Sequence, residues 1–520
     1  NKKNDQENVD FETAISLTGF GKYNYLMLLV AVPAAWSTLF DTTTMSYILP
    51  SAECDLSLSN LNKGVLNAMV YAGMISSAFL WGFLSDTLGR RKLLVAGYLV
   101  LAIIMILSSL SQVFWVLALF KFFGGFVSSG PFAVLLTYLA EFNSSQHRAR
   151  IMMIVGIYTS LGIITVPGLA WLLIPQSWSW TLFGDYKFNS WRLFLLVSAV
   201  PGLLGGCTIW FFEESPKFLM SSGRTQEALN VFRKVYRINT GNPAEMYPVV
   251  SLAKDNRAEK ETATPEESQS KNRDPMIFLK EGYKQIRPFF HKPYVSKALL
   301  VFTIQFGGLW SLNTIRLWLP QLFAIVEEYF TLNESTSGNA TLCDMLSMRT
   351  GKQVVNETAL SLDQVCVPVQ VGDTMYLYSI IVGAITALFN LSASSVINCL
   401  GKKKILIIGY LGGCCCVVAM YWCNSMEILL VLSSLYIGSG SMSANALLSV
   451  VVDLFPTTLR TTAVSMTMMI GRIGALTGNL TFPVFLEVSC SLPFFLMGAI
   501  MCLCSLLTCI LPRTTGKALE

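Results

Sequence analysis

Long apolar stretches alternate with short polar connections along most of this chain. Stretches of roughly 20 residues recur, and a helix of that length crosses a hydrocarbon core of ~30 Å. Because backbone polar groups inside lipid must be satisfied within their own segment, these stretches predict helices rather than isolated strands. We expect twelve spans, near residues 24–49, 64–84, 93–111, 114–139, 151–174, 191–212, 296–326, 374–397, 405–422, 427–452, 462–486 and 491–511.

The order of the spans predicts two similar halves. Six spans precede a long polar stretch and six follow it, so we expect an all-α integral membrane protein with two pseudo-symmetric six-helix bundles. The expected parts are an N-terminal segment at 1–23, a bundle at 24–212, a central loop at 213–295, a bundle at 296–511 that includes an external loop at 327–372, and a tail at 512–520.

A motif that recurs at a fixed offset indicates that the halves arose by duplication. The run GFLSDTLGRRK at residues 82–92 recurs 312 residues later, degraded, as SSVINCLGKKK at 394–404. The same shift relates Glu141 with Arg148 to Asp453 with Arg460. Two independent motifs rarely share one offset by chance, and duplicated halves in a membrane are typical of secondary transporters.

Composition narrows the class of protein. The chain is 53% apolar and 13% charged, whereas a soluble protein averages about 25% charged residues. The basic residues form loop clusters rather than a basic aromatic surface, so we expect no nucleic-acid partner. No G-x-x-x-x-G-K-[ST] run occurs, which argues against direct ATP drive. A polar segment precedes the first span, so no cleavable signal peptide is expected.

Loop charge predicts the orientation. The central loop 213–295 carries 14 Lys or Arg, and the loop 327–372 carries two. Positive loops stay on the cytoplasmic side, so we expect the basic loops, both termini and the central loop there. The external loop also holds three glycosylation sequons, at Asn333, Asn339 and Asn356. Plasma membrane and intracellular vesicle membrane remain alternatives for this multi-pass protein.

Cysteines of the external loop suggest a disulfide. Cys343 and Cys366 lie on the oxidising side, and a bridge between them would stabilise the fold by roughly 3 kcal/mol. The pairing stays open, because other cysteines also lie at external ends of spans: Cys54, Cys423 and Cys490. The run at 414–416 predicts packing inside a span, and no metal site or cofactor is expected.

Each part of the repeated motif has a separable physical role. Gly82 allows close helix approach, Gly89 permits a tight turn, and Asp86 can pair with a cation. Basic side chains on the same side can bridge to Glu141 and Asp453. The expected gating network is Gly82, Asp86, Gly89, Arg90, Arg91, Lys92, Glu141, Arg148, Asn398, Gly401, Lys402, Asp453 and Arg460.

On these residues the sequence resembles the major facilitator superfamily, which carries this pattern between helices 2 and 3. The resemblance implies that the network latches the cytoplasmic gate while the protein faces outward. The second copy has Asn398 in place of Asp86, and an amide forms no charge-assisted bond, so its latch should be weaker.

Further motifs resemble the synaptic vesicle glycoprotein 2 family and its organic-ion and sugar-porter relatives. They include LPSAE at 49–53, FNSWR at 188–192 and EESPKFL at 213–219. Two departures matter: the external loop is too short for the large lumenal domain of that family's vertebrate members, and Arg513 replaces the usual Glu of the motif after the last span, here LPRTTG at 511–516. The resemblance therefore implies a relative with a short loop rather than a vertebrate synaptic protein.

Ionisable residues inside spans are the default candidates for function, because they are costly in lipid. They are Asp41, Lys121, Arg316 and Arg472, and each could instead be a structural ion-pair partner. Further substrate or coupling candidates are Trp171, Trp310, Tyr376 and Asn445. One acid against three bases favours an organic anion or a zwitterion as the solute.

Transport is the expected function. We expect movement of a small organic solute (an organic ion, zwitterion or sugar-like molecule) by alternating access, with the lipid bilayer as the surroundings and proton or sodium coupling as options. The two histidines lie outside the spans, so a carboxylate must carry protons if they are coupled, and Asp41 is the best candidate. The alternative is a non-transporting vesicle glycoprotein that acts in trafficking or partner binding. No catalytic motif points to an enzyme. Residues 224–236 predict an amphipathic cytoplasmic helix braced under both halves.

Overall fold

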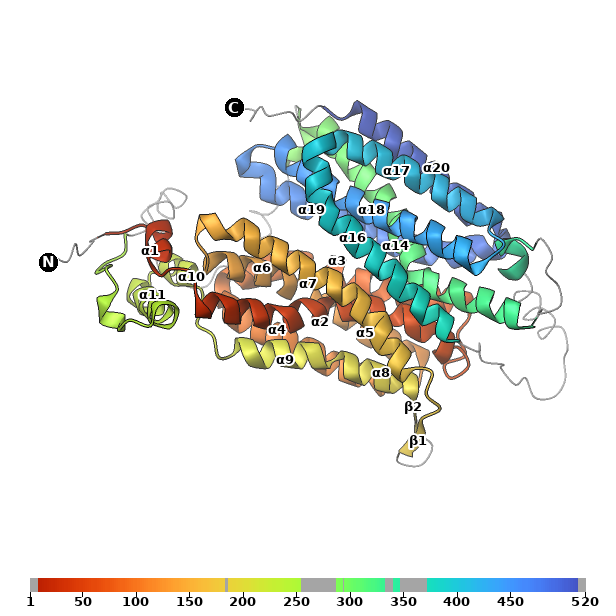
Figure 1. Ribbon diagram of the computed structural model, residues 1–520, viewed down its shortest axis with the longest axis horizontal. Coiled ribbons are helices and arrows are strands. Elements are labelled where there is room, and N and C mark those ends of the chain that lie inside the picture. The colour runs from red at the N-terminus through yellow and green to blue at the C-terminus, as the bar shows by residue number, and fades with distance from the viewer. Residues whose placement is uncertain are drawn as a thin grey trace.

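The chain folds into two helical bundles that lie side by side, red to yellow and green to blue in Figure 1. This computed structural model describes residues 8–182, 186–253, 287–292, 294–332, 340–346 and 372–512. The long helices of the N-terminal half are α2 (Lys22–Ala52), α3 (Asn60–Leu88), α4 (Arg90–Ser109), α5 (Phe114–Ser128), α6 (Pro131–Glu141), α7 (Ser145–Leu173), α8 (Ser190–Ser198) and α9 (Val200–Ile209).

The C-terminal half repeats the arrangement with six uninterrupted helices. They are α14 (Val295–Leu332), α16 (Asp373–Leu400), α17 (Lys402–Ala419), α18 (Met426–Leu454), α19 (Thr457–Val488) and α20 (Ser491–Ile510). Short 3-10 turns adjoin them at Arg287–Phe290 and Met420–Trp422. Because each helix covers one predicted span, the all-helical two-bundle expectation is confirmed.

Eleven helical segments within the described residues are long and apolar enough to cross a membrane. In that count α5 continues into α6 and α8 into α9, and proline begins the second member of each pair, at Pro131 and Pro201. A proline lacks the backbone N–H of a helix interior, so it is favoured where a helix starts afresh. Helix α3, with 29 residues, lies against α5 and α19 and takes the place of the remaining predicted span.

We name the two ends of the molecule by what they carry. The basic end holds Arg90 and Lys402, the first residues of α4 and α17. Small elements gather there: α1 (Phe11–Leu17), α10 (Pro216–Ser221), α11 (Thr225–Thr240) and a 3-10 turn at Ala244–Met246. The hairpin end holds β1 (Ser179–Leu182) and β2 (Tyr186–Asn189), which pair antiparallel. The sequence predicts no strand here; Trp180 faces Phe188 across the pair with ring centroids 6.3 Å apart.

Helix α11 is amphipathic, as its sequence pattern predicts. Its buried side chains include Leu229, Phe232 and Val235, and they pack in one apolar cluster with α1, α2 and α10. In the described part of the chain it packs chiefly against α1, α2, α10 and the 3-10 turn at Ala244–Met246, and bracing under both halves stays a prediction. One turn after the helix, Tyr247 is buried and donates a hydrogen bond to the Ala14 carbonyl; burial raises the pKa of its hydroxyl.

The disulfide differs from the one expected. Cys343 bonds to Cys490, which precedes α20, and not to Cys366, which lies outside the described residues. The bond is accompanied by apolar burial of the neighbouring side chains Leu342 and Met345 in the core. Sequence spacing favours partners in one loop, but here the fold brings together residues 147 positions apart. Cys54 is also disulfide-bonded.

Candidate functional site

An ion pair lies buried in the N-terminal half, between α2 and α5. The Lys121 Nζ is 3.6 Å from the Asp41 Oδ1, and each side chain is only 1% exposed. Lys121 also donates a hydrogen bond of 3.1 Å to the Thr44 hydroxyl. A Cβ at Gly124 would come within 2.7 Å of the Asp41 carboxylate, so a glycine is needed for this close approach. Asp41 and Lys121, two separate candidates in the sequence, are therefore partners.

A small cavity between the two halves contains Arg316 of α14. Its volume is about 50 Å³, which leaves room for a few water-sized groups. Hydroxyl groups share the lining with Arg316 and come from both halves: Thr43, Ser46 and Tyr47 of α2, and Ser379 and Thr386 of α16. Within this lining Arg316 is the one charged residue. The cavity thus combines a fixed positive charge with hydroxyl oxygens that can accept hydrogen bonds, since Ser46, Ser379 and Thr386 donate their own protons to backbone carbonyls.

Arg472 of α19 lies close to the same region. Its Nη1 donates a hydrogen bond of 3.2 Å to the Ser129 hydroxyl of the N-terminal half. Tyr71 of α3 lies near the guanidinium groups of both Arg316 and Arg472, and its hydroxyl donates a bond of 3.2 Å to the Asn313 Oδ1. No carboxylate of the described residues forms an ion pair with either arginine. Among the described residues, the middle of the molecule therefore holds two arginines without a carboxylate partner.

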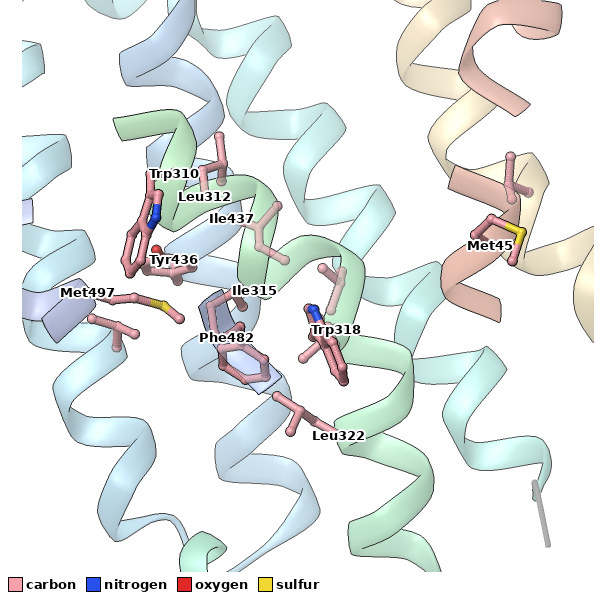
Figure 2. Close-up of a cluster of buried hydrophobic side chains, with 14 of the residues drawn as sticks. Met45, Trp310, Leu312, Ile315, Trp318, Leu322, Tyr436, Ile437, Phe482 and Met497 are labelled. Atoms are coloured by element: carbon pink, nitrogen blue, oxygen red, sulfur yellow. The ribbon is translucent and has the colours of Figure 1, made fainter. Parts of the chain in front are cut away.

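Other substrate candidates lie away from this cavity. Figure 2 shows Trp310 among Tyr436, Met497 and other apolar side chains, so it packs in the core of the C-terminal half. Trp171 donates to the Asp373 Oδ1 over 2.9 Å at the hairpin end. Tyr376 is fully buried near the start of α16, and Asn445 donates to Asn390 over 3.3 Å. None of the four lines the cavity.

The two copies of the sequence motif form equivalent contacts at the basic end. Arg90 Nε is 3.5 Å from the Glu141 Oε2, and 312 residues later Lys402 Nζ is 2.5 Å from the Asp453 Oδ2. Gly89 and Gly401 precede these cations with φ of 92° and 80°, a region that favours glycine. The duplication is therefore visible in matching turns and matching ion pairs.

The remaining network residues have different partners. Arg148 pairs with Glu12 of α1 rather than with Glu141, and the backbone N–H of Arg91 donates to Glu214 over 2.9 Å. The Nε of Arg460 has no hydrogen-bond partner in the described part of the chain. A Cβ at Gly82 would meet nothing within 4 Å. Lys92 lines a pocket with α11, and the side chains of Asp86 and Asn398 lie outside the description.

Contacts between the halves gather at the middle and at the hairpin end. Besides the bonds made by Tyr71, Arg472 and Trp171, α3 meets α19 so closely that a Cβ at Gly64 would lie 2.6 Å from the Asn479 carbonyl. At the basic end, the ion pairs that join described side chains each stay within one half. The halves are thus closed against each other at the hairpin end.

Polar contacts at the hairpin end were not predicted. Arg192 is 1% exposed, lies 3.2 Å from the Asp55 Oδ2 and stacks on Trp191. Lys63 and Glu53 form a second buried pair at 3.0 Å. Glu53, Trp191 and Arg192 occur in the motifs at 49–53 and 188–192, which is the signal that could have pointed to these contacts. They hold the ends of α2, α3 and α8 together.

Comparison of the sequence with known proteins finds relatives of this chain. Synaptic vesicle glycoprotein 2B of Homo sapiens is 23% identical over 98% of this chain and 86% of its own length. Synaptic vesicle glycoprotein 2A of Rattus norvegicus is 30% identical over 48% of this chain and 35% of its own.

Solved structures share the fold. The xylose transporter XylE from E. coli, in a partially occluded inward open conformation, matches with a TM-score of 0.64 and 18% identity over 96% of this chain and 100% of that one. A crystal structure of a D-xylose-proton symporter matches with a TM-score of 0.65, 17% identity and the same coverage. The family model described as Major Facilitator Superfamily matches residues 31–340 and 363–519. With its duplicated bundles and its basic turn motif, this chain belongs to the Major Facilitator Superfamily.

Proposed function

We propose that this protein carries a small organic solute across a membrane by alternating access, and that the structure is its inward-facing state. The observation that carries the proposal is the uneven distribution of the contacts between the halves along the molecule. Polar bonds and close helix packing join them at the middle and at the hairpin end, whereas the ion pairs of the basic end stay within each half. A solute at the cavity would then exchange with the basic side.

The basic end is proposed to face the cytoplasm. The positive-inside tendency of loop charge supports it, because α4 and α17 begin there with Arg90, Arg91 and the Lys402–Lys404 run. Both termini would then be cytoplasmic, and the loop with the sequons at Asn333, Asn339 and Asn356, outside the described residues, would be external.

The outward-facing state requires the reverse contacts. Rocking of the bundles would separate α3 from α19 at the hairpin end and bring α3 and α19 together at the basic end. The open surface at Gly82 and the unbonded Nε of Arg460 supply groups for that closure. The repeated ion pairs would hold the turns before α4 and α17 in shape during the motion.

Proton coupling is proposed through the buried pair. Protonation of Asp41 would remove the charge that Lys121 contacts at 3.6 Å and so release a link between α2 and α5. Asp41→Asn should therefore abolish pH-driven accumulation while it leaves exchange intact. Uptake by this variant with unchanged dependence on a pH gradient would reject the coupling role.

A crosslinking experiment tests alternating access directly. Trp171→Cys with Asp373→Cys places two thiols across the halves at the hairpin end, where the native side chains are hydrogen-bonded. The control pair, Arg224→Cys with Glu227→Cys, lies within α11 and its N-cap. The measurement is counterflow of labelled succinate, D-xylose and tetraethylammonium in proteoliposomes, before and after a short thiol crosslinker.

Alternating access predicts that crosslinking stops counterflow in the first pair, that reduction restores it, and that the control pair is unaffected. Persistent counterflow through a crosslinked hairpin end would contradict the mechanism. Failure of every probe to move in the unmodified protein would favour the alternative of a vesicle glycoprotein without transport.

A further inference from the structure

The inference concerns the chemical class of the solute and rests on the proposed transport. The described middle of the bundles has four ionisable side chains that the sequence singles out, and two of them compensate each other as the Asp41–Lys121 pair. Arg316 and Arg472 have no carboxylate partner among the described residues. Charges inside a membrane are costly when unpaired, so two such arginines call for a negative partner.

The surroundings of Arg316 fit a carboxylate better than a lone inorganic counter-ion. Its guanidinium shares the cavity with hydroxyls from both halves, at Ser46, Tyr47 and Ser379. A guanidinium presents a planar fork of donors that matches a carboxylate bidentately, and neighbouring hydroxyls can bond the rest of an oxygen-bearing molecule. The Nε of Arg316 makes no hydrogen bond within the described residues, so part of that fork is available.

Apolar side chains complete the lining of the cavity, and they fit a carbon skeleton better than an inorganic ion. Ile163, Val166, Val382 and Ile437 line it beside the hydroxyls. A short carbon skeleton would contact these side chains while its charged end meets Arg316. Pockets for small molecules typically combine such apolar lining with a few polar groups that orient the ligand.

We propose that the solute is a small organic anion whose carboxylate binds Arg316, while hydroxyls of α2 and α16 bond its remaining oxygens. Arg472, across Tyr71 from Arg316, supplies the second positive charge of the site. Neutral sugars and organic cations leave both arginines uncompensated and are therefore excluded.

Binding and counterflow of defined probes test this assignment. The probes are succinate and L-lactate as carboxylates, D-xylose as a neutral sugar and tetraethylammonium as a cation. The variants are Arg316→Gln, Arg316→Lys and the control Arg237→Gln, whose side chain is exposed near the end of α11. Thermal unfolding of each purified protein with and without probe reports binding, and its value without probe shows whether the variant is folded.

We expect at least one carboxylate to stabilise the wild type and Arg237→Gln, and neither xylose nor tetraethylammonium to do so. Arg316→Gln should weaken carboxylate binding by about tenfold or more, and Arg316→Lys, which keeps the charge without the fork, by less. If Arg316→Gln does not fold, the comparison of Arg316→Lys with the wild type decides by the same criterion, a loss of carboxylate affinity.

Three results would overturn the inference: no effect of either carboxylate on the wild type, binding of xylose or tetraethylammonium, or full carboxylate affinity without Arg316. Counterflow of xylose alone would overturn the anion assignment and leave transport standing. Carboxylate binding that depends on Arg316, together with no counterflow of any probe, would support the anion site and overturn the proposed transport.

Discussion

Removing one member of the buried Asp41–Lys121 pair should lower the free energy of unfolding by more than half of what removing both members costs. Both side chains are 1% exposed, so water does not replace a lost partner. Breaking a buried pair by removing one member costs about 3–5 kcal/mol, because an uncompensated charge remains. The informative set is Asp41→Asn, Lys121→Met and the double variant.

The two single variants should differ in a direction that the contacts define. In Asp41→Asn the ammonium keeps the Thr44 hydroxyl at 3.1 Å and the carbonyl of residue 41 at 3.5 Å. In Lys121→Met the Asp41 carboxylate loses its one cationic partner among the described residues. We therefore expect Lys121→Met to be the more destabilised of the two.

The double variant measures the coupling between the two residues. With no charge left unpaired, it should recover about 2–3 kcal/mol relative to the sum of the single changes. The assay is denaturant unfolding of the purified proteins in mixed micelles. As a control, Arg224→Gln with Glu227→Gln removes a pair whose side chains are 45% and 59% exposed, and its coupling should stay below about 0.5 kcal/mol. Additive effects at Asp41 and Lys121 would refute the ion pair as an energetic unit.

Three further predictions concern other parts of the chain. Replacement of the sequon residues Asn333, Asn339 and Asn356 should abolish any glycosidase-sensitive gel shift, and a remaining shift would place the sugar elsewhere. Peptide mapping without reduction should recover the Cys343–Cys490 linkage, and either Cys→Ser variant should lower the thermal stability. Asp86→Asn should slow exchange in counterflow more than Asn398→Ala, because an amide already stands in the second copy; equal effects would contradict this asymmetry.

The helices could be predicted because their cause is local. The length of an apolar stretch decides whether it spans, and helices begin at glycine turns and prolines that the sequence displays, as at Gly89 and Pro131. The actual helices run past the predicted spans at the basic end: α4 starts at Arg90 and α17 at Lys402. Hydropathy ends a span at the first charge, whereas the backbone continues its hydrogen bonds through charged residues that reach water.

The site was only partly predictable, because partners depend on the crossing of helices. Asp41, Lys121, Arg316 and Arg472 stand out in the sequence, since charge is rare in spans. Which of them pair is decided by the close approach of α2 and α5 at Gly124. The hydroxyls that line the cavity have no such signal, because serine, threonine and tyrosine occur in spans for many reasons.

The prediction of the disulfide partner was wrong for a related reason. Spacing along the chain favours a short loop, and Cys343 with Cys366 offered one. The segment around Cys343 instead packs Leu342 and Met345 into the apolar core, which directs the thiol to the turn before α20. Tertiary burial of neighbouring side chains therefore overrides proximity in sequence.

The two halves share an origin but divide the charges unequally, and this division has a mechanistic consequence. In the N-terminal half the buried Asp41 and Lys121 pair with each other, whereas Arg316 of α14 and Arg472 of α19 have no carboxylate partner among the described residues. A ligand that supplies the missing negative charge would bind the C-terminal half through the arginines and the N-terminal half through hydroxyls of α2. Since a ligand shifts a conformational equilibrium only through contacts that differ between the states, an anion held by both halves favours the state in which they approach. Protonation of Asp41 acts on the N-terminal half alone. The proton would therefore act within one bundle, whereas the solute would act on both and so on the contact between α3 and α14 that Tyr71 makes with Asn313.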